Sequence, residues 1–283
     1  MKDATQIPFL IKLMDDRSPR VRERVANQLH AFGPELETEI LRQAIPVSIE
    51  QRLMLDEILQ RDGDTVLRKQ WQSWLDSQHD DEYGKLEAAL SLLARWQSGN
   101  EYSLDLSELL DDLADEYLRC DWPIEPETLS QWLFTDLGRN FHGASPEGLY
   151  NPRHSNLLEV IEKGRGIPIS LASVFILVGH RLNLDVSGCN FPGHFLARAH
   201  VEDEDGGREL FFDCFGGGRV LAEHEVAALF KAAPGAMSEP APALVMVARV
   251  LRNLVVAYEQ TGSLDKVRLM LELLGELEQA AGV

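Results

Sequence analysis

The spacing of apolar residues predicts that residues 1–76 fold as a series of short helices. Apolar side chains recur there at intervals of three and four residues, which places them on one face of a helix. The first stripe is Ile7, Phe9, Leu10, Leu13 and Met14, and the second is Val21, Val25, Leu29 and Phe32. Between the stripes, Ser18 can cap the second helix, with Pro19 at its first position. Further helices are expected at 35–44, 48–61 and 64–75.

The same periodicity continues into the middle of the chain. Amphipathic helices are expected at 83–97, 104–118 and 127–137, and the second of them is strongly acidic on its outer face. The third is expected to turn four side chains inward, namely Leu129, Trp132, Leu133 and Leu137. A loop rich in Gly, Ser and Pro at 138–152 separates these helices from the next part of the chain.

After residue 156 the pattern predicts strands as well as helices. A short helix at 156–162 is followed by Pro168, which opens a longer helix through Leu182. Three strands are then expected near 185–191, 194–201 and 208–213. Gly206-Gly207, flanked by the acids of 202–205, is a hairpin signal between the second and third strands. The fold class predicted is therefore α+β, mostly helical, with a small antiparallel sheet.

Both ends of the chain resemble helical repeats. The segment at 15–33 is similar to the start of the second helix of a HEAT repeat. Two helices expected within 243–280, around Thr261-Gly262-Ser263, look like a single tetratricopeptide-type unit. About three such units are needed for an independent array, so this one is expected to pack on the core. Three domains are predicted: a HEAT-like region at 1–76, a core with its preceding helices at 77–233, and a linker with a helical hairpin at 234–283.

Composition and charge exclude several classes of protein. Hydrophobic residues make up 45% of the chain and charged residues 26%, as in folded soluble proteins. No apolar run approaches the roughly 20 residues of a membrane span, and the first residues lack the apolar stretch of a signal peptide. We therefore expect a cytoplasmic protein that makes no contact with membranes. The net charge of −19 repels phosphate backbones, so nucleic-acid binding is not expected.

The acidic charge is uneven along the chain. Residues 77–163 hold 18 acidic and 6 basic side chains. This excess either attracts the basic surface of a partner or forms solvated helix faces. The oligomeric state is left open.

Metal and cofactor sites are not expected. Three scattered cysteines give neither a disulfide framework nor a zinc spacing, and no His-x-x-His or paired Glu pattern is present. The glycines around Arg165 and at 216–218 do not lead from a strand into a helix, so they are interpreted as turns rather than phosphate loops.

The candidate chemistry lies between the helix that Pro168 opens and the third strand. A helix start, a strand beginning at His194 and a strand ending at Asp213 form the layout of a papain-like or transglutaminase-like core. Such an enzyme needs a thiolate at the helix start, a histidine base and an acid that orients the histidine. His194 and Asp213 match the last two roles, but Pro168 stands close to the position of the cysteine.

Two residues are candidate replacements for the missing nucleophile. Ser170 lies in the first turn of the helix, where its hydroxyl could either face His194 or support the helix start. Cys189 lies five residues before His194, where it is either a thiol near the ring or a small buried apolar side chain. Cys214 is expected to point away from any site, because it follows Asp213 along a strand. Cys120 falls in a distant loop.

These motifs together resemble a bacterial family of transglutaminase-like proteins with C-terminal tetratricopeptide-type helices, often labelled regulators of SirC expression. The resemblance spans residues 129–278 and rests on Tyr150-Asn151-Pro152-Arg153, Gly166-Ile167-Pro168-Ile169-Ser170-Leu171, Pro192-Gly193-His194-Phe195-Leu196 and Asp213-x-Phe215-x-Gly217-Gly218. Two positions depart from the pattern: His154 stands in place of Asn before Ser155, and Cys214 in place of Pro after Asp213.

The resemblance implies a transglutaminase-like core of the papain-like superfamily. Two hypotheses about function stay open. The first is a non-catalytic or regulatory scaffold, an inactivated enzyme whose core and flanking helices bind a protein or peptide. The second is a hydrolase or acyltransferase on peptide amides, with Ser170 or Cys189 as nucleophile, His194 as base and Asp213 as orienting acid.

Overall fold

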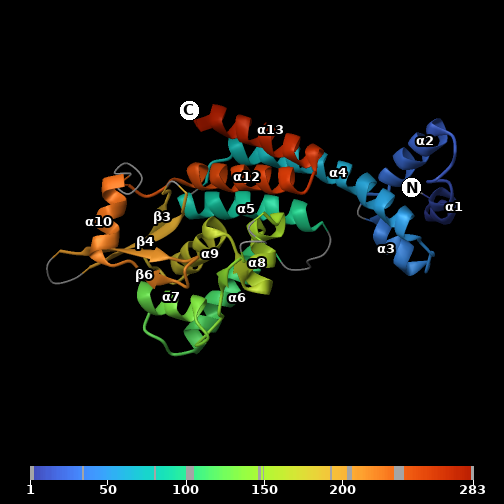
Figure 1. Cartoon of the computed structure of the whole chain (residues 1–283). Coiled ribbons are helices and arrows are strands. Elements are labelled where there is room, and N and C mark those ends of the chain that lie inside the picture. Colours follow the sequence, from blue (N-terminus) through green and yellow to red (C-terminus); the bar gives the residue numbers. More distant parts are fainter. Residues whose placement is uncertain are drawn as a thin grey trace. The chain divides into compact units, whose positions relative to one another are not determined.

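The structure is a computed structural model of the chain and is drawn in Figure 1. It describes residues 3–33, 35–79, 81–99, 105–145, 148, 150–191, 193–202, 206–232 and 239–281. The chain divides into two compact units. Unit 1 comprises residues 1–70 and 98–101, and unit 2 comprises residues 71–97 and 102–283.

Unit 1 is built from helices α1, α2 and α3 and the first part of α4. Their bounds are Ile7–Lys12, Pro19–His30, Glu35–Arg42 and Ile49–Asp76. Its core is the set of buried apolar side chains that includes Ile7, Ile11, Leu29, Leu36 and Leu55. Side-chain amides add long-range ties, because Gln43 donates to the carbonyl of Ala4 and Gln51 to that of Ile11.

Three details of unit 1 differ from the prediction. Phe9 and Leu13 of the first stripe are exposed, because short α1 buries only one narrow face. Ser18 occupies the N-cap of α2, but its side chain makes no cap hydrogen bond. The break expected between 61 and 64 is absent, and α4 continues through Gly63. One glycine costs a helix only about 1 kcal/mol, which neighbouring turns offset.

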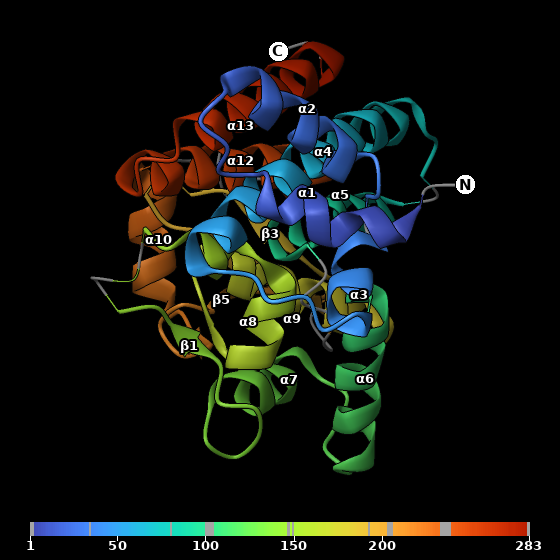
Figure 2. The same ribbon diagram turned by 90° about the vertical axis from the view of Figure 1, so that its right-hand side faces the viewer.

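Unit 2 is centred on helix α9 (Pro168–Arg181), in which every residue from Ile169 to Gly179 is buried. Such a helix is apolar on all sides because other elements surround it. Helix α8 lies beside it (Figure 2). The remaining helices before the sheet are α5 (Glu82–Ser98), α6 (Leu106–Arg119), α7 (Pro126–Phe134) and α8 (Leu157–Lys163).

The sheet of unit 2 has four antiparallel strands in the order β3-β4-β5-β6. Their bounds are Val186–Cys189, Leu196–Val201, Arg208–Asp213 and Arg219–Val220. Strands of this sheet lie between α9 and α10 (Glu223–Ala232) in Figure 1. Phe175 of α9 contacts Phe212 on one face, and Phe230 of α10 contacts Phe211 on the other. Phe211 and Phe212 are adjacent in β5 and therefore point to opposite faces of the sheet, where α10 and α9 bury them.

The last two helices form an antiparallel hairpin of α12 (Ala243–Gln260) and α13 (Leu264–Ala281), as predicted. Helix α12 runs alongside α5, because Glu82 accepts from the backbone nitrogen of Ala243 and Gln97 donates to the Tyr258 hydroxyl. The hairpin therefore packs on the core of unit 2.

The predicted fold class is confirmed: the chain is mostly helical with a small four-stranded antiparallel sheet. Some inward side chains were predicted wrongly, since Leu137 is 61% exposed and lies beyond the end of α7. A two-residue parallel pair, β1 (His142–Gly143) with β2 (Arg165–Gly166), was not predicted. The HEAT-like character of the first helices and the three domain boundaries stay predictions. Within the described residues, none of the helices has both the length and the apolarity of a membrane span.

Candidate functional site

His194 and Asp213 lie together at one end of the sheet. Nε2 of His194 is 2.9 Å from Oδ1 of Asp213, and the two side chains are 31% and 14% exposed. Asp213 is the last residue of β5, and His194 lies in the loop between β3 and β4. The hairpin pairs Cys189 with Leu196, which brings the histidine loop back over the sheet end. A partly exposed imidazole oriented by a carboxylate can act as a base or as a fixed hydrogen-bonding group.

Several groups hold the carboxylate of Asp213 in its ionised form. Burial raises the pKa of Asp213, but hydrogen bonds from His194 and from the backbone N–H of Gly216, with the charge of Arg219, outweigh that effect. The pKa therefore lies below its ordinary value of 3.8. The Gly216 nitrogen is 2.8 Å from Oδ1, and Arg219 Nε is 3.7 Å from Oδ2. An ionised carboxylate on Nε2 fixes the orientation of the ring.

The hydroxyl of Ser170 is fully buried and already hydrogen-bonded. It accepts from the backbone N–H of Ile167 at 2.9 Å and donates to the carbonyl of His154 at 2.7 Å. The Ile167 carbonyl is a further acceptor at 3.0 Å. Ser170 thus satisfies the N-cap residue of α9 from the third helical position. Among the described residues, no hydrogen bond joins Ser170 to the His194 ring.

Cys189 is the last residue of β3, and its side chain is fully buried with Leu196, Phe211 and Leu221. Burial raises the pKa of its thiol to about 11. A thiol attacks as the thiolate, which is scarce near neutral pH at this pKa. Cys214 is also buried, and burial raises the pKa of its thiol strongly. Cys120 is exposed at the end of α6.

Phe215 lies beside His194, although in the sequence it stood out only as part of a motif and not as a candidate site residue. Its ring packs edge-on to the His194 ring, with centroids 6.4 Å apart and planes at 83°. A Cβ added to Gly143 would lie 2.7 Å from the Phe215 ring, so strand β1 approaches the site as closely as glycine allows. The Asp213-x-Phe215 motif could have indicated this position from the sequence. The β1–β2 pairing that brings Gly143 against Phe215 could not, because it joins residues far apart in the chain.

His142 and His154 lie near the core but do not join the His194 pair. Nδ1 of His142 is 2.8 Å from the Asn140 carbonyl oxygen, and Nδ1 of His154 is 2.7 Å from that of Gly148. Within the described residues, no group of three or more His, Cys, Asp or Glu side chains is arranged as a metal site.

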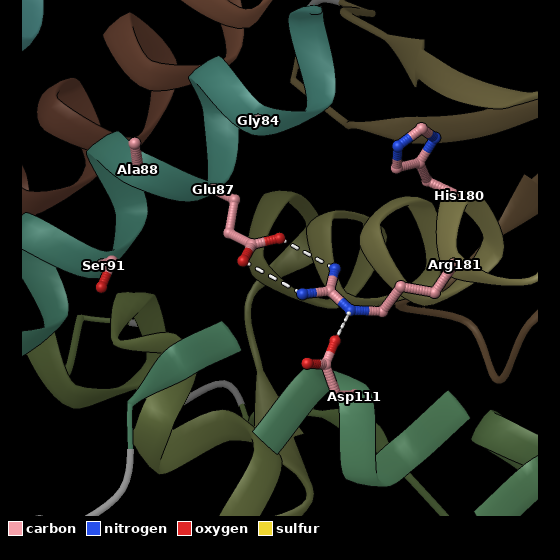
Figure 3. A pocket seen from close by; sticks show the side chains of 7 residues that line it. All are labelled: Gly84, Glu87, Ala88, Ser91, Asp111, His180 and Arg181. Carbon is pink, nitrogen blue, oxygen red and sulfur yellow. Dashed lines mark hydrogen bonds and ion pairs between the residues drawn. The ribbon is translucent and has the colours of Figure 1, made fainter. Parts of the chain in front are cut away.

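A pocket of about 470 Å³ opens elsewhere in unit 2, between α5, α6 and α9 (Figure 3). Arg181 of α9 dominates it. Its guanidinium binds both oxygens of Glu87 at 2.8 and 3.0 Å, and Nε binds Asp111 at 2.6 Å. Arg181 and Glu87 are 15% and 19% exposed. The polar groups of this pocket thus largely satisfy one another and hold three helices together.

Comparisons with known proteins identify the family of the chain. A model of the transglutaminase-like superfamily matches residues 100–252. A UPF0162 protein of Xylella fastidiosa (strain 9a5c) is 34% identical over 206 residues, which cover 66% of this chain and 69% of that protein. A UPF0162 protein of Vibrio cholerae is 26% identical over 96 residues, 34% of each chain. One from Pseudomonas aeruginosa is 40% identical over 68 residues, 22% of this chain and 25% of that protein.

No solved structure matches the chain. The superfamily model covers more than half of the chain, including α9, His194 and Asp213. The chain therefore belongs to the transglutaminase-like superfamily and, within it, to the bacterial UPF0162 proteins.

Proposed function

We propose that this chain is a non-catalytic transglutaminase-like scaffold that binds a peptide or protein partner. The observation that carries the proposal is the state of Ser170, whose buried hydroxyl serves the helix start and a distant carbonyl. A nucleophilic serine needs a hydrogen bond to its base and access to a substrate. Ser170 has its bonds elsewhere and no exposed surface.

Cys189 supports the same conclusion by a different route. Its thiol belongs to the apolar cluster between the sheet and α10, and burial raises its pKa to about 11. Reactive cysteines are partly exposed and have lowered pKa values. The pairing of His194 with Asp213 then has a structural role, because it fastens the β3–β4 loop to the end of β5.

The charge of the chain favours a basic partner. The net charge is −19, and α6 exposes Asp112 and Asp115. Such a field speeds the approach of a positively charged segment and repels an acidic one. The resemblance to regulators of SirC expression, with their tetratricopeptide-type helices, fits a role in protein binding.

A turnover assay tests the non-catalytic part of the proposal. The full chain is incubated with fluorogenic peptide amides and esters, with and without an amine acceptor. We expect no release above the buffer rate. The matched control for His194→Ala is His200→Ala, because His200 also bonds a carboxylate but lies on an exposed part of β4. Turnover that disappears with His194→Ala and survives His200→Ala would overturn the proposal.

A selection from a displayed random-peptide library tests the binding part. We expect enrichment of peptides rich in Lys and Arg, whose affinity falls as salt rises. If they bind at the candidate site, Phe215→Ala should weaken them about tenfold, as loss of an aromatic anchor does. Phe230→Ala, an aromatic change on α10, is the control. Failure to enrich any peptide, or binding indifferent to Phe215, contradicts this site.

One observation favours the alternative, a hydrolase or acyltransferase on peptide amides. The Nε2–Oδ1 contact between His194 and Asp213 is the contact that a histidine base needs from its orienting acid. In this alternative a rearrangement exposes Ser170 or Cys189 to the ring. Trapping either residue with an electrophilic peptide, followed by mass spectrometry, would support it.

A further inference from the structure

Arg249 of the C-terminal hairpin donates hydrogen bonds to the loop that carries His194. Arg249 of α12 is half-buried, and its Nη1 lies 2.9 Å from Asn190 Oδ1 and 3.1 Å from the Phe191 carbonyl oxygen. The same carbonyl accepts the backbone N–H of His194 at 3.2 Å. One oxygen atom therefore joins the guanidinium of Arg249 to the backbone of His194.

Helix α12 is well placed to hold this loop because its first part contacts strand β3 closely. The backbone N–H of Ala241 donates to the Gly188 carbonyl at 2.8 Å, next to Cys189. A Cβ added to Gly188 would lie 2.9 Å from Met246 Sδ and 2.7 Å from the Phe195 ring. The strand entering the histidine loop is thus fixed by a backbone bond to Ala241, two residues before α12, and by close packing against Met246 in the first turn of that helix.

The hydrogen bonds that the structure shows for the Arg249 guanidinium go to the loop that carries His194. Among the described residues no carboxylate pairs with Arg249, although the chain carries 46 acidic side chains. Burial lowers the pKa of Arg249, and the nearby charge of Arg252 lowers it further. Partial burial of a charge is unfavourable unless hydrogen bonds compensate it. The oxygens of Asn190 and Phe191 provide those bonds.

We propose that Arg249 is a positioning residue for His194, through which the C-terminal hairpin sets the place of the candidate-site histidine. The inference rests on the proposed function only in that it concerns the regulation of the same site. A partner that engages α12 and draws Arg249 outward would release Asn190 and Phe191, loosen the backbone bond of His194 and separate its imidazole from Asp213. The hairpin is then a control element as well as a packing element.

The experiment compares Arg249→Ala with Arg252→Ala in the full chain by NMR. Arg252 lies one turn further along α12, and its pairing with Glu278 is exposed, so it is a matched control. In Arg249→Ala we expect the His194 amide to exchange with solvent about tenfold faster, because its acceptor carbonyl is no longer held. The pKa of the Asp213 carboxyl, followed by its ¹³C shift, should rise toward the ordinary value as the His194 bond weakens.

Arg249→Lys and Asn190→Ala complete the design. Lysine keeps the charge and donates from a single nitrogen instead of a planar guanidinium, so it should restore the Asp213 titration partly. Asn190→Ala removes one acceptor, leaves Arg249 in place and provides the test if Arg249→Ala does not fold. Unchanged exchange at His194 and an unchanged Asp213 pKa, in whichever of these variants folds, would overturn the inference. Neither readout involves a ligand, so a failed peptide selection contradicts the proposed function and leaves this test intact.

Discussion

The hydroxyl oxygen of Ser170 lies 2.7 Å from the carbonyl oxygen of His154, a residue that precedes it by 16 positions. This bond joins the first turn of α9 to the short 3₁₀ helix at Pro152–Ser155. It also gives the most conspicuous candidate nucleophile a structural role. If Ser170 has this structural role alone, it cannot serve as the nucleophile of a hydrolase.

Replacing Ser170 with alanine should destabilise unit 2. The substitution removes the hydroxyl from the buried N–H of Ile167 and from the carbonyl of His154, which keep only their longer mutual hydrogen bond of 3.3 Å, so we expect a loss of about 1 kcal/mol of unfolding free energy. Ser173→Ala is the control, because that buried hydroxyl donates to the Ile169 carbonyl of its own helix, with no second partner among the described residues. Urea unfolding should show a clearly larger loss for Ser170→Ala, and equal losses would contradict the capping role.

The low pKa of Asp213 predicts a pH-dependent contribution to stability. A carboxyl whose pKa is lower in the folded state than in the unfolded state stabilises the fold above the unfolded pKa. That contribution is lost as the pH falls through the folded pKa. The difference in unfolding free energy between wild type and Asp213→Asn should therefore be largest above about pH 5 and shrink below about pH 4. If the difference in unfolding free energy grows as the pH falls, the pKa of Asp213 is raised in the folded state and not lowered.

Loss of Arg181 should be among the most damaging changes in unit 2. Arg181→Met leaves the carboxylate of Glu87, which is only 19% exposed, without its bidentate partner (Figure 3). Both side chains are only partly buried, so the cost should lie below the roughly 3–5 kcal/mol of a fully buried pair, at about 2–3 kcal/mol. Arg119→Met removes the exposed bridge to Asp115 and should cost less than about 1 kcal/mol. Addition of Glu87→Gln to Arg181→Met should recover part of the loss in the same denaturation experiment.

Two glycine substitutions should act in opposite directions. Gly166→Ala places a Cβ 2.6 Å from the Ser170 hydroxyl oxygen and 3.1 Å from Leu171, so we expect destabilisation. Gly275 lies within α13, and nothing would lie within 4 Å of an added Cβ. Gly275→Ala should therefore raise the unfolding free energy by about 0.5–1 kcal/mol. Thermal unfolding of both variants checks the signs.

Thiol labelling should distinguish the three cysteines. Cys120 is exposed, whereas Cys189 and Cys214 have no exposed surface. A disulfide reagent should modify one thiol rapidly in the native chain and all three in denaturant. Loss of the rapid phase in Cys120→Ser would assign it. Rapid native labelling of Cys189 would show that this thiol is accessible and would favour the enzyme alternative.

Much of the fold was visible in the sequence because its signals are local. Pro168 followed by a mostly apolar segment predicted helix α9, and the pattern after Leu182 predicted β3, β4 and β5. The contact of His194 with Asp213 was expected from their order at strand ends. Wrong predictions arose where exposure depends on a partner, as for Phe9, Leu13 and Leu137, since periodicity cannot tell which positions a neighbour covers.

The sequence by itself determined the kind and order of most of the elements, though not of α10, β6 or the β1–β2 pair, together with the acidic charge and the two motifs that meet in the His194–Asp213 contact. Hydrogen bonding within helices and the alternation of strands depend on residues a few positions apart, so a linear pattern carries them. Only the tertiary structure decided the states of Ser170 and Cys189 and the hold of Arg249 on the histidine loop. Each depends on an atom contributed from elsewhere in the chain: the carbonyl of His154, the cover of α10 and the carbonyl of Phe191. Folding brings such atoms together across long sequence separations, and no local pattern records where they meet.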